Sequence, residues 1–239
     1  MPLHALRGPG PSPLTPHGFF ITGTDTGVGK TLIACALLHA FARTGLRVVG
    51  MKPVAAGAVH SAEGLINDDV AQLRAASSVK AELALVNPYC FEPAIAPHIA
   101  AAQAGVTIDC TRIAQAHARL AAMADVVVVE GAGGFCVPLN SSENAADLAY
   151  YFGLPVILVV GVRLGCMNHA LLTAQAIRAR GLKLAGWIAN RIDPAMPVAE
   201  ENVTALAERL AAPLLGEIEF TVAPDPEHLA ALFDLSNLA

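Results

Sequence analysis

The sequence predicts a single-domain α/β protein with a doubly wound, mostly parallel sheet and helices on both faces. Short apolar runs alternate with longer stretches of helical periodicity along most of the 239 residues. The segment DVVVVE at 125–130 is the continuous β-branched type found in strands buried on both faces. A glycine-rich loop joins the first apolar run to the first helical stretch. Such alternation implies parallel strands with right-handed crossovers, and ligands at the carboxyl ends of the strands.

The individual elements follow from these periodicities. Strands are expected where short apolar runs are bounded by glycine or proline, at residues 19–22, 47–53, 125–130, 155–160, 183–190 and 214–218. Helices are expected where apolar residues recur at helical spacing, at residues 31–44, 108–124, 144–152, 168–180 and 198–210. The stretch 54–99 is less regular. A helix over 69–76 and a strand around 85–89 are expected there, and its loops are candidates for substrate contact.

Composition excludes several classes of protein. Only 15% of the residues are charged, the net charge is −5, and the 15 basic residues are dispersed rather than gathered into the stripe that nucleic-acid binding requires. The five cysteines lie far apart and form no C-x-x-C pair, so neither a zinc ribbon nor a redox motif is indicated. Reduced and mostly buried thiols are expected, which fits the cytoplasm.

No apolar run reaches the ~18 residues that a membrane-spanning helix needs, so no membrane contact is expected. Residues 1–18 are rich in proline and lack the apolar core of a signal peptide. They are expected to form a disordered leader, followed by one domain over residues 19–239.

The loop GTDTGVGKT at residues 23–31 carries most of the chemical information. A phosphate-binding P-loop has the pattern G-x-x-x-x-G-K-[ST], whereas here six steps rather than five separate Gly23 from Gly29. The context is nevertheless complete, because a strand precedes the loop and a helix begins at its end. Backbone N–H groups and the helix N-terminus would bind phosphate, Lys30 would reach the outer phosphates, and the Thr31 hydroxyl would ligate Mg²⁺. An ordinary strand-to-helix turn does not require lysine followed by threonine.

The extra residue makes the loop bulge. One side chain or N–H group is then directed away from the nucleotide, toward whatever lies beyond the γ-phosphate. Thr24, Asp25 or Thr26 is therefore expected to touch a second substrate.

Six segments in this order and at these separations resemble the ATP-dependent dethiobiotin synthetases, P-loop enzymes of biotin synthesis: GTDTGVGKT, MKPVAAG, NDD, VEGAGG, VGVRLGCMNHALLTAQ and GWIAN. The resemblance extends from about residue 19 to residue 218, and the lengthened loop is usual in that family. It implies a P-loop NTPase fold, ATP and Mg²⁺ as cofactors, and a cytoplasmic homodimer. The implied reaction converts 7,8-diaminononanoate and CO₂ to dethiobiotin through a carbamate and a carbamic-phosphoric anhydride, with release of ADP and phosphate.

Two acidic positions are candidate metal ligands beside Thr31. Glu130 ends a hydrophobic strand, where a Walker B acid would hold Mg²⁺, although a lone acid at a strand end is the alternative. The resemblance implies that Asp69 is a further ligand. Asp68 competes with it, and both acids lie where they would complement a helix dipole.

Lys52 ends the second strand, and Pro53 biases it toward an extended conformation. A solvated lysine at a strand end is the alternative. The resemblance implies that Lys52 faces the carbamate and the transferred phosphoryl group, where a cation offsets the repulsion between two anions. Lys52, Lys30 and Thr26 are therefore the expected catalytic residues.

The segment LGCMNHA begins at Leu164 and lies at a strand-to-helix junction, where exposed N–H groups suit an anion. The resemblance implies that this segment lies at the homodimer interface and receives the substrate carboxylate from the neighbouring subunit; a plain helix cap by Asn168 is the alternative. The expected substrate contacts are Thr26, Lys52, Ala56, Leu164, Gly165 and Asn168.

Asn190 ends another strand and matches the residue that binds adenine in the family, since an amide offers both a donor and an acceptor. The loop after residue 218 would close over the base, although EFTVAPDPEHL matches the family loosely. The expected nucleotide contacts are Gly27, Val28, Gly29, Lys30, Thr31, Leu32, Asp69, Glu130, Gly131, Ala132, Gly133, Asn190, Arg191, Glu219, Phe220, Thr221 and Glu227.

Three positions depart from the pattern of much-studied members. Ala56 replaces a common serine, Gly27 replaces a glutamate of some members, and Glu219 replaces a common proline. Gly27 does not disturb a backbone cradle, whereas Ala56 removes one hydrogen bond to the substrate, worth roughly 0.5–1.5 kcal/mol.

The main alternative function is a ParA/MinD-like ATPase switch that binds a partner protein. Those ATPases usually carry a signature lysine early in the loop, and this loop has no lysine before Lys30. A terminal amphipathic basic helix for membrane binding is also missing from the pattern. His98 is expected to be a packed or capping histidine, and Trp187 a core residue.

Overall fold

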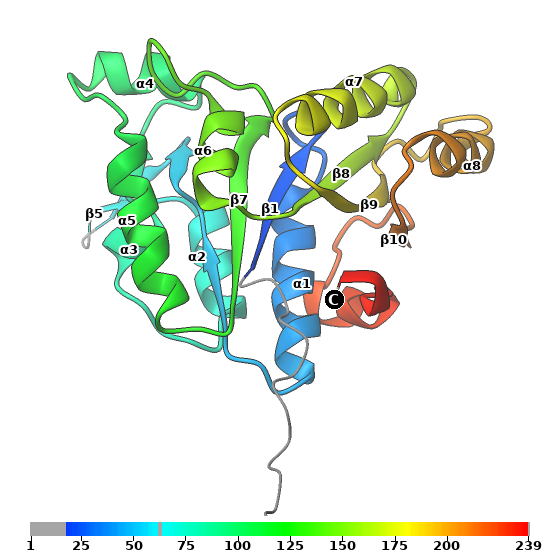
Figure 1. The fold of residues 1–239 in the computed structure, drawn as a ribbon, viewed down its shortest axis with the longest axis horizontal. Coiled ribbons are helices and arrows are strands. Elements are labelled where there is room, and N and C mark those ends of the chain that lie inside the picture. Colours follow the sequence, from blue (N-terminus) through cyan, green and yellow to red (C-terminus); the bar gives the residue numbers. More distant parts are fainter. Residues whose placement is uncertain (1–17, 62–63, 239) are drawn as a thin grey trace, which may run out of the picture.

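The computed structural model describes residues 18–61 and 64–238. The expected leader lies outside the described residues except for Gly18, which opens the first strand. The centre of the fold is a six-stranded sheet in which all neighbouring strands run parallel (Figure 1). Its strands, in spatial order, are β10 (Leu214–Ile218), β9 (Leu184–Arg191), β8 (Val156–Val162), β1 (Gly18–Gly23), β7 (Val126–Gly134) and β2 (Val48–Met51). The predicted α/β fold class is confirmed.

Two small sheets lie beside the central one. β3 (Val54–Ala56) pairs in parallel with β6 (Tyr89–Phe91), and β4 (Val59–Ser61) pairs antiparallel with β5 (Gly64–Ile66). The sequence did not predict β3, β4 or β5. Each is three residues long, too short to display a periodicity.

Helices connect the strands and cover the sheet. They are α1 (Lys30–Arg43), α2 (Asp68–Ala76), α3 (Leu83–Val86), α4 (Pro97–Gln103), α5 (Cys110–Ala121), α6 (Ala145–Phe152), α7 (Cys166–Ala179), α8 (Ala199–Arg209) and α9 (Pro226–Leu229), followed by the 3₁₀ turns η1 (Ala230–Leu232) and η2 (Ser236–Leu238). The six predicted helices are all present, with ends within three residues of those expected.

The strand predicted around residues 85–89 is wrong. Residues Leu83–Val86 form the single helical turn α3, and the strand begins only at Tyr89. Pro88 has no N–H group to donate to a sheet ladder, and it restricts the residue before it. The turn buries Leu85 and Val86 and leaves the Val86 carbonyl free to accept a hydrogen bond from the Lys52 N–H (2.9 Å). This contact ties the segment to the end of β2.

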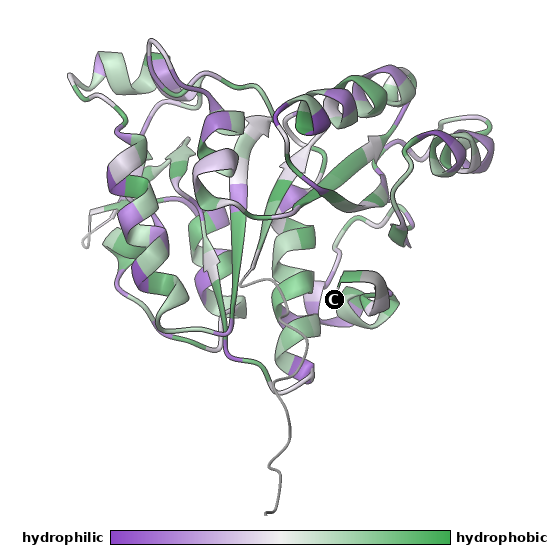
Figure 2. Cartoon of the chain, viewed as in Figure 1, coloured by the Kyte–Doolittle hydropathy of each residue, from purple (hydrophilic) through white to green (hydrophobic). Residues whose placement is uncertain are grey.

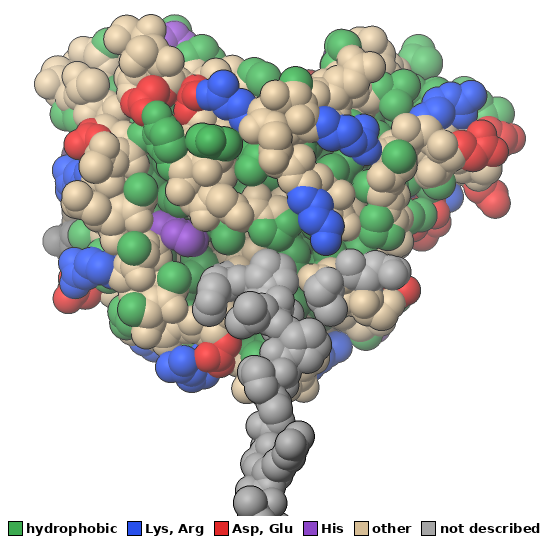
Figure 3. Space-filling view, viewed as in Figure 1, with side chains coloured by type: hydrophobic (Ala, Val, Ile, Leu, Met, Phe, Trp, Pro, Cys, Tyr) green, Lys and Arg blue, Asp and Glu red, His purple; other side chains and the backbone are tan. Residues whose placement is uncertain are grey.

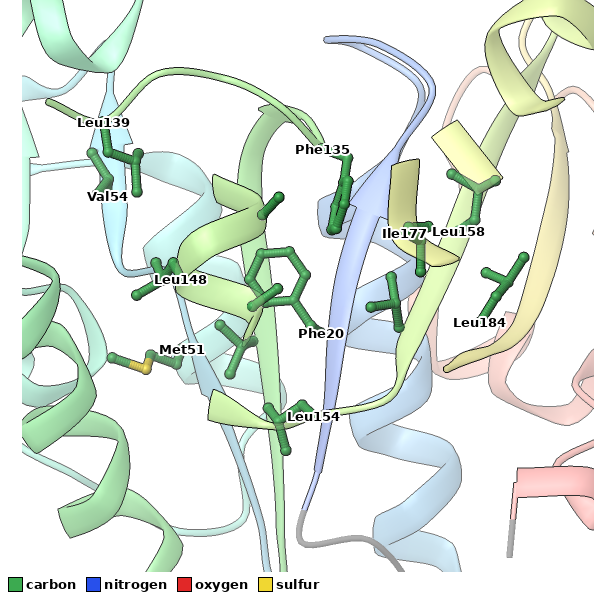
Figure 4. Packing of buried hydrophobic residues seen from close by; sticks show 14 of the residues in the cluster. Phe20, Met51, Val54, Phe135, Leu139, Leu148, Leu154, Leu158, Ile177 and Leu184 are labelled. Carbon is green, nitrogen blue, oxygen red and sulfur yellow. The ribbon is translucent and has the colours of Figure 1, made fainter. Parts of the chain in front are cut away.

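The central sheet is buried on both faces, and its side chains alternate between two cores. Along β1, Phe20 faces the core under α5, α6 and α7, whereas Phe19 and Ile21 face the core under α1 and α2. Figure 4 shows Phe20 in the first core, between Leu148 of α6 and Leu154. Because β1 has no solvated face, it reads as a continuous apolar run.

The distribution of apolar residues on each helix follows how much of that helix is covered. Nine of the fourteen residues of α1 are buried, because the sheet, α2 and α9 surround it. In Figure 2, α1 is mostly hydrophobic, whereas α5 combines a hydrophobic stripe with a hydrophilic outer face. A helix covered on several sides needs apolar residues all round, while a surface helix needs only one stripe.

The described residues carry mixed surface charges and free cysteines. None of their helices combines the length and apolar character that crossing a membrane requires. The face seen in Figure 3 carries basic and acidic side chains interspersed, with no basic stripe. All five cysteines are free, and Cys35, Cys110 and Cys166 are buried. Trp187 is fully buried in β9, as predicted, and His98 is half-buried in α4.

His117 of α5 makes the fold sensitive to acid. It is 9% exposed and packs against the Phe152 ring at a centroid distance of 4.5 Å, and its Nε2 has no hydrogen-bond partner in the part of the chain that the structure describes. Burial lowers its pKa from 6.5 to about 4. Between pH 6.5 and pH 4, His117 is protonated in the unfolded chain but neutral in the folded chain. The free energy of unfolding therefore decreases as the pH falls from 6.5 toward 4.

We expect the free energy of unfolding to decrease by about 2 kcal/mol between pH 7 and pH 5 through this residue. Urea denaturation at both pH values measures the change. His117→Leu should remove most of this dependence, whereas His228→Leu, at an exposed histidine, should retain it. Equal pH dependence in both variants would contradict the assignment.

Candidate active site

A cavity of about 730 Å³ opens at the carboxyl ends of β1, β2 and β7. This is the edge at which ligands bind in parallel α/β sheets. It brings together eleven of the residues singled out from the sequence: Thr26, Gly27, Gly29, Lys30, Thr31, Lys52, Ala56, Asp69, Glu130, Ala132 and Gly133.

The P-loop joins β1 to α1 and depends on glycines with positive φ. Gly27 and Gly29 have φ angles of 75° and 90°, in the left-handed region that favours glycine. A Cβ atom at Gly29 would also lie 2.3 Å from the side-chain nitrogen of Asn190. The last glycine of the motif is therefore required both by its own conformation and by the close approach of β9.

Lys30 is the first residue of α1 and is only 6% exposed. Its Nζ donates a hydrogen bond to the Asp25 carbonyl (2.8 Å). Burial lowers the pKa of Lys30 to about 8, and the positive charge of Lys52 acts in the same direction, while Glu130, Asp69 and Asp25 oppose the shift. An anionic ligand would favour the charged ammonium form.

Lys52 and Glu130 form a buried ion pair at the centre of the cavity. Lys52 Nζ lies 2.5 Å from Glu130 Oε1 and 2.7 Å from Asp69 Oδ2, and the Thr31 hydroxyl donates to the same Glu130 oxygen (2.9 Å). The side chains of Lys52 and Glu130 are 7% and 1% exposed. Lys52 is thus no solvated lysine at a strand end, and Glu130 is no isolated acid.

The two carboxylates keep this lysine charged. Burial by itself favours the neutral amine, but the charges of Glu130 and Asp69 outweigh it and raise the pKa of Lys52. Burial by itself would raise the pKa of Asp69, but the charge of Lys52 and its hydrogen bond to Asp69 lower it. Asp68, by contrast, is exposed at the start of α2. Of the two adjacent acids, Asp69 is the one that reaches the cavity.

Oxygen atoms suited to a hard cation gather at this point. Among the described residues, the buried Glu130 Oε2 has no hydrogen-bond partner, although Oε1 has two. Within the described ranges, no three His, Cys, Asp or Glu side chains form a metal-binding group. Two carboxylates and a hydroxyl are too few to enclose a metal, but they suit Mg²⁺, which usually retains water and phosphate oxygens. Thr31, Asp69 and Glu130 therefore fit a Mg²⁺ ion brought with a nucleotide.

Apolar residues, here called the apolar wall, line the same cavity as the charged cluster, and the sequence did not predict them individually. The only signals were the two prolines at 93 and 97 and the irregular stretch in which they lie. The wall is formed by Val54, Ala94, Ile95, Ala96, Pro97 and Val137.

Several predicted nucleotide contacts lie outside the cavity lining. Asn190 is buried, and its side-chain nitrogen donates to the Val28 carbonyl beneath the P-loop (2.9 Å). Arg191 pairs with Glu217 (2.6 Å) and Glu219 (3.3 Å). The remaining ones are Val28, Leu32, Gly131, Glu219, Phe220, Thr221 and Glu227, of which Glu219, Phe220, Thr221 and Glu227 lie in the segment after β10. A role of these residues in nucleotide binding stays a prediction.

The predicted carboxylate-binding segment is also separate from the cavity. Leu164 is 91% exposed, and Gly165, with φ 94°, precedes the first turn of α7. No side chain caps the N-terminus of this helix in the described structure, so the alternative role of Asn168 as a cap is not observed. The surface formed by Leu164, Gly165 and Asn168 remains available to another molecule.

The fold and the phosphate-binding loop define a P-loop nucleotide-binding domain. The family described as AAA domain matches residues 17–227, and the chain belongs to it. Among solved structures, the chain is similar to the MinC:MinD cell division protein complex of Aquifex aeolicus (16% identity, TM-score 0.53, 86% of this chain and 82% of that one). It is also similar to the signal recognition particle receptor FtsY of Elizabethkingia anophelis (18%, 0.50, 93% and 64%). At these identities the likeness concerns the fold alone.

Curated relatives identify the particular family. The chain is 59% identical to the ATP-dependent dethiobiotin synthetase BioD of Aromatoleum aromaticum over 90% of this chain and 96% of that protein. It is 56% identical to the protein of the same name from Nitrosospira multiformis, over 92% and 96%. The chain therefore belongs to the ATP-dependent dethiobiotin synthetase family, as its motifs predicted.

The Lys52–Glu130 pair yields a stability prediction. Lys52→Met leaves the Glu130 carboxylate buried without its cation, and we expect the free energy of unfolding to fall by about 3–5 kcal/mol. The double variant Lys52→Met/Glu130→Gln has no buried charge at this point and should recover most of the loss. Urea denaturation measures both, with Lys183→Met as the surface control. A loss in Lys52→Met no greater than in the control would contradict the pairing.

Proposed function

We propose that this protein is an ATP-dependent dethiobiotin synthetase, a ligase that forms C–N bonds in biotin biosynthesis. It carboxylates 7,8-diaminononanoate with CO₂ and closes the product to the cyclic urea of dethiobiotin. The observation that carries the proposal is a buried, charged lysine, Lys52, held by Glu130 and Asp69 directly beside the P-loop. The identity with the relatives described above supports it independently.

Three bond-forming steps account for the reaction. One amine of the substrate adds to CO₂ and loses a proton, which gives a carbamate. A carbamate oxygen then attacks the γ-phosphorus of ATP, and ADP leaves. Finally the second amine attacks the carbonyl carbon, and phosphate leaves as the ring closes. Because the nucleophiles belong to the substrate, the protein has to position the reactants and stabilise charge.

Charge is the main obstacle, since an anionic carbamate has to approach an anionic phosphate. We propose that Lys30, at the N-terminus of α1, binds the phosphate, and that Lys52, which lines the same cavity, contacts the group beyond it. Thr31, Asp69 and Glu130 would hold Mg²⁺, which supplies further charge neutralisation for the triphosphate. Preorganised positive groups of this kind usually provide the largest catalytic contribution.

The apolar wall suits the aliphatic chain of the substrate. Its residues 94–97, Val54 and Val137 line the same cavity as the charged cluster. Burial of the methylene groups would contribute about 0.8 kcal/mol for each CH₂. We propose that the two amines of the substrate lie toward Lys52 and Thr26, with the chain along this wall.

The substrate carboxylate then requires a site of its own. We propose that a second copy of the chain supplies it through Leu164, Gly165 and Asn168, in a homodimer. The start of α7, which no side chain caps in the described structure, and the 91% exposed Leu164 support this assignment. Free thiols at all five cysteines agree with a cytoplasmic location, which we also propose.

One assay tests the reaction directly. The protein is incubated with the diamine, Mg-ATP and labelled bicarbonate, and label is expected in a ureido ring. Lys30→Ala should reduce product formation by at least about 100-fold, because it removes a positive group at the reacting phosphate. Lys183→Ala, at an exposed lysine of the opposite sheet edge, is the matched control. Absence of label with the unmodified protein would overturn the proposed function.

A second measurement tests the carboxylate site. Asn168→Ala should raise the KM for the diamine by about tenfold and leave the KM for ATP unchanged, because hydrogen bonds to charged groups are worth about 1.5–3 kcal/mol. Gln175→Ala lies on the exposed face of the same helix and should change neither constant. An unchanged KM for the diamine in Asn168→Ala would remove this residue from the site.

A further inference from the structure

An acidic residue lies inside the phosphate-binding loop. Asp25 is situated between Gly23 and Gly27, and its side chain is 45% exposed. A carboxylate in a loop that binds a triphosphate is unfavourable, because like charges at short distance repel each other. The structure therefore has to compensate this charge for the loop to accept ATP.

Asp25 makes three contacts that hold the front half of the loop. Its carbonyl accepts the hydrogen bond from Lys30 Nζ at 2.8 Å. Its Oδ1 accepts from the Thr26 N–H at 2.7 Å, and its Oδ2 pairs with the Arg163 guanidinium at 2.5 Å. The side-chain contact to Arg163 is the only one of the three that comes from a distant part of the chain.

Arg163 directly follows β8 and opens the turn that leads to α7. Thr24 attaches the loop to β8 through both its backbone and its side chain. The Thr24 N–H donates to the Val159 carbonyl (3.0 Å), and the Gly161 N–H donates to the Thr24 hydroxyl (3.3 Å). Arg163 thus approaches Asp25 from the carboxyl end of β8.

The charges around the loop balance only when Arg163 is included. The cations are Lys30, Lys52 and Arg163, and the carboxylates are Asp25, Asp69 and Glu130. Lys52 is already paired with Glu130 and Asp69, and Lys30 contacts a carbonyl rather than a carboxylate. Within the described structure, Arg163 is therefore the cation in direct contact with the Asp25 carboxylate.

We propose that Arg163 is a positioning residue for ATP: it neutralises Asp25 and holds it so that the loop accepts the triphosphate beside Lys30. This role rests on the proposed function and adds to it a residue outside the P-loop motif. Because both side chains are about half exposed, the pair contributes little to the stability of the fold. Its effect on nucleotide binding is consequently separable from folding.

Nucleotide titration without the diamine tests the proposal. In Arg163→Gln the Asp25 charge is uncompensated, and we expect the Kd for Mg-ATP and the KM for ATP to rise by about tenfold, with kcat at saturating ATP changed by less than about threefold. Arg163→Lys should bind within about threefold of the unmodified protein, because it retains the charge. The double variant Asp25→Asn/Arg163→Gln should also bind Mg-ATP within about threefold of the unmodified protein, because neither charge remains and the amide oxygen still accepts a hydrogen bond from the Thr26 N–H.

Arg209→Gln is the matched control, because Arg209 is a half-exposed arginine paired with an acid on α8. The Kd of Arg209→Gln for Mg-ATP should equal that of the unmodified protein. The melting temperature should remain unchanged in every variant. Unchanged ATP binding in Arg163→Gln would overturn the proposal. So would weaker binding that is accompanied by a lower melting temperature and is not rescued by Asp25→Asn, since that result indicates a structural role. Failure of the unmodified protein to label the ureido ring would instead count against the proposed function and leave this binding result intact.

Discussion

The buried pair of Lys52 and Glu130 is the interaction on which the site depends. Removing two charges from water costs several kcal/mol for each ion, and this cost is recovered only when geometry and further hydrogen bonds are favourable. Asp69 and the Thr31 hydroxyl provide those additional bonds. One cluster thereby joins the end of β2 and the middle of β7 to the first turns of α1 and α2. Sheet register makes this possible, because Met51 is paired with Val129 and places the next residue of each strand side by side.

The fold of this protein and its activity depend on different features. MinD and FtsY share the fold at 16–18% identity, so the parallel sheet and the P-loop do not by themselves define an activity. In this chain the cavity beside the P-loop carries the buried pair of Lys52 and Glu130 together with the apolar wall. A buried cation and an apolar surface in one cavity agree with the proposed ligase activity on a small amphipathic substrate.

The lengthened P-loop has a structural consequence beyond its spacing. Its front half is attached to the end of β8, while its rear half continues into α1. The phosphate-binding loop is therefore supported from two neighbouring strands, β1 and β8. The Asp25–Arg163 contact belongs to this support, and it joins the loop to the turn that begins α7.

The sequence by itself determined the α/β class, the six central strands, the main helices and the positions of the P-loop residues, because periodicity and motif spacing are local properties of the chain. It also placed Lys52, Asp69 and Glu130 at element ends facing one edge of the sheet. Only the tertiary structure decided that Asp69 rather than Asp68 contacts Lys52, that residues 83–86 form a helical turn, and that Arg163 reaches Asp25. These outcomes depend on strand register and on contacts between residues up to 138 positions apart, which no local pattern contains.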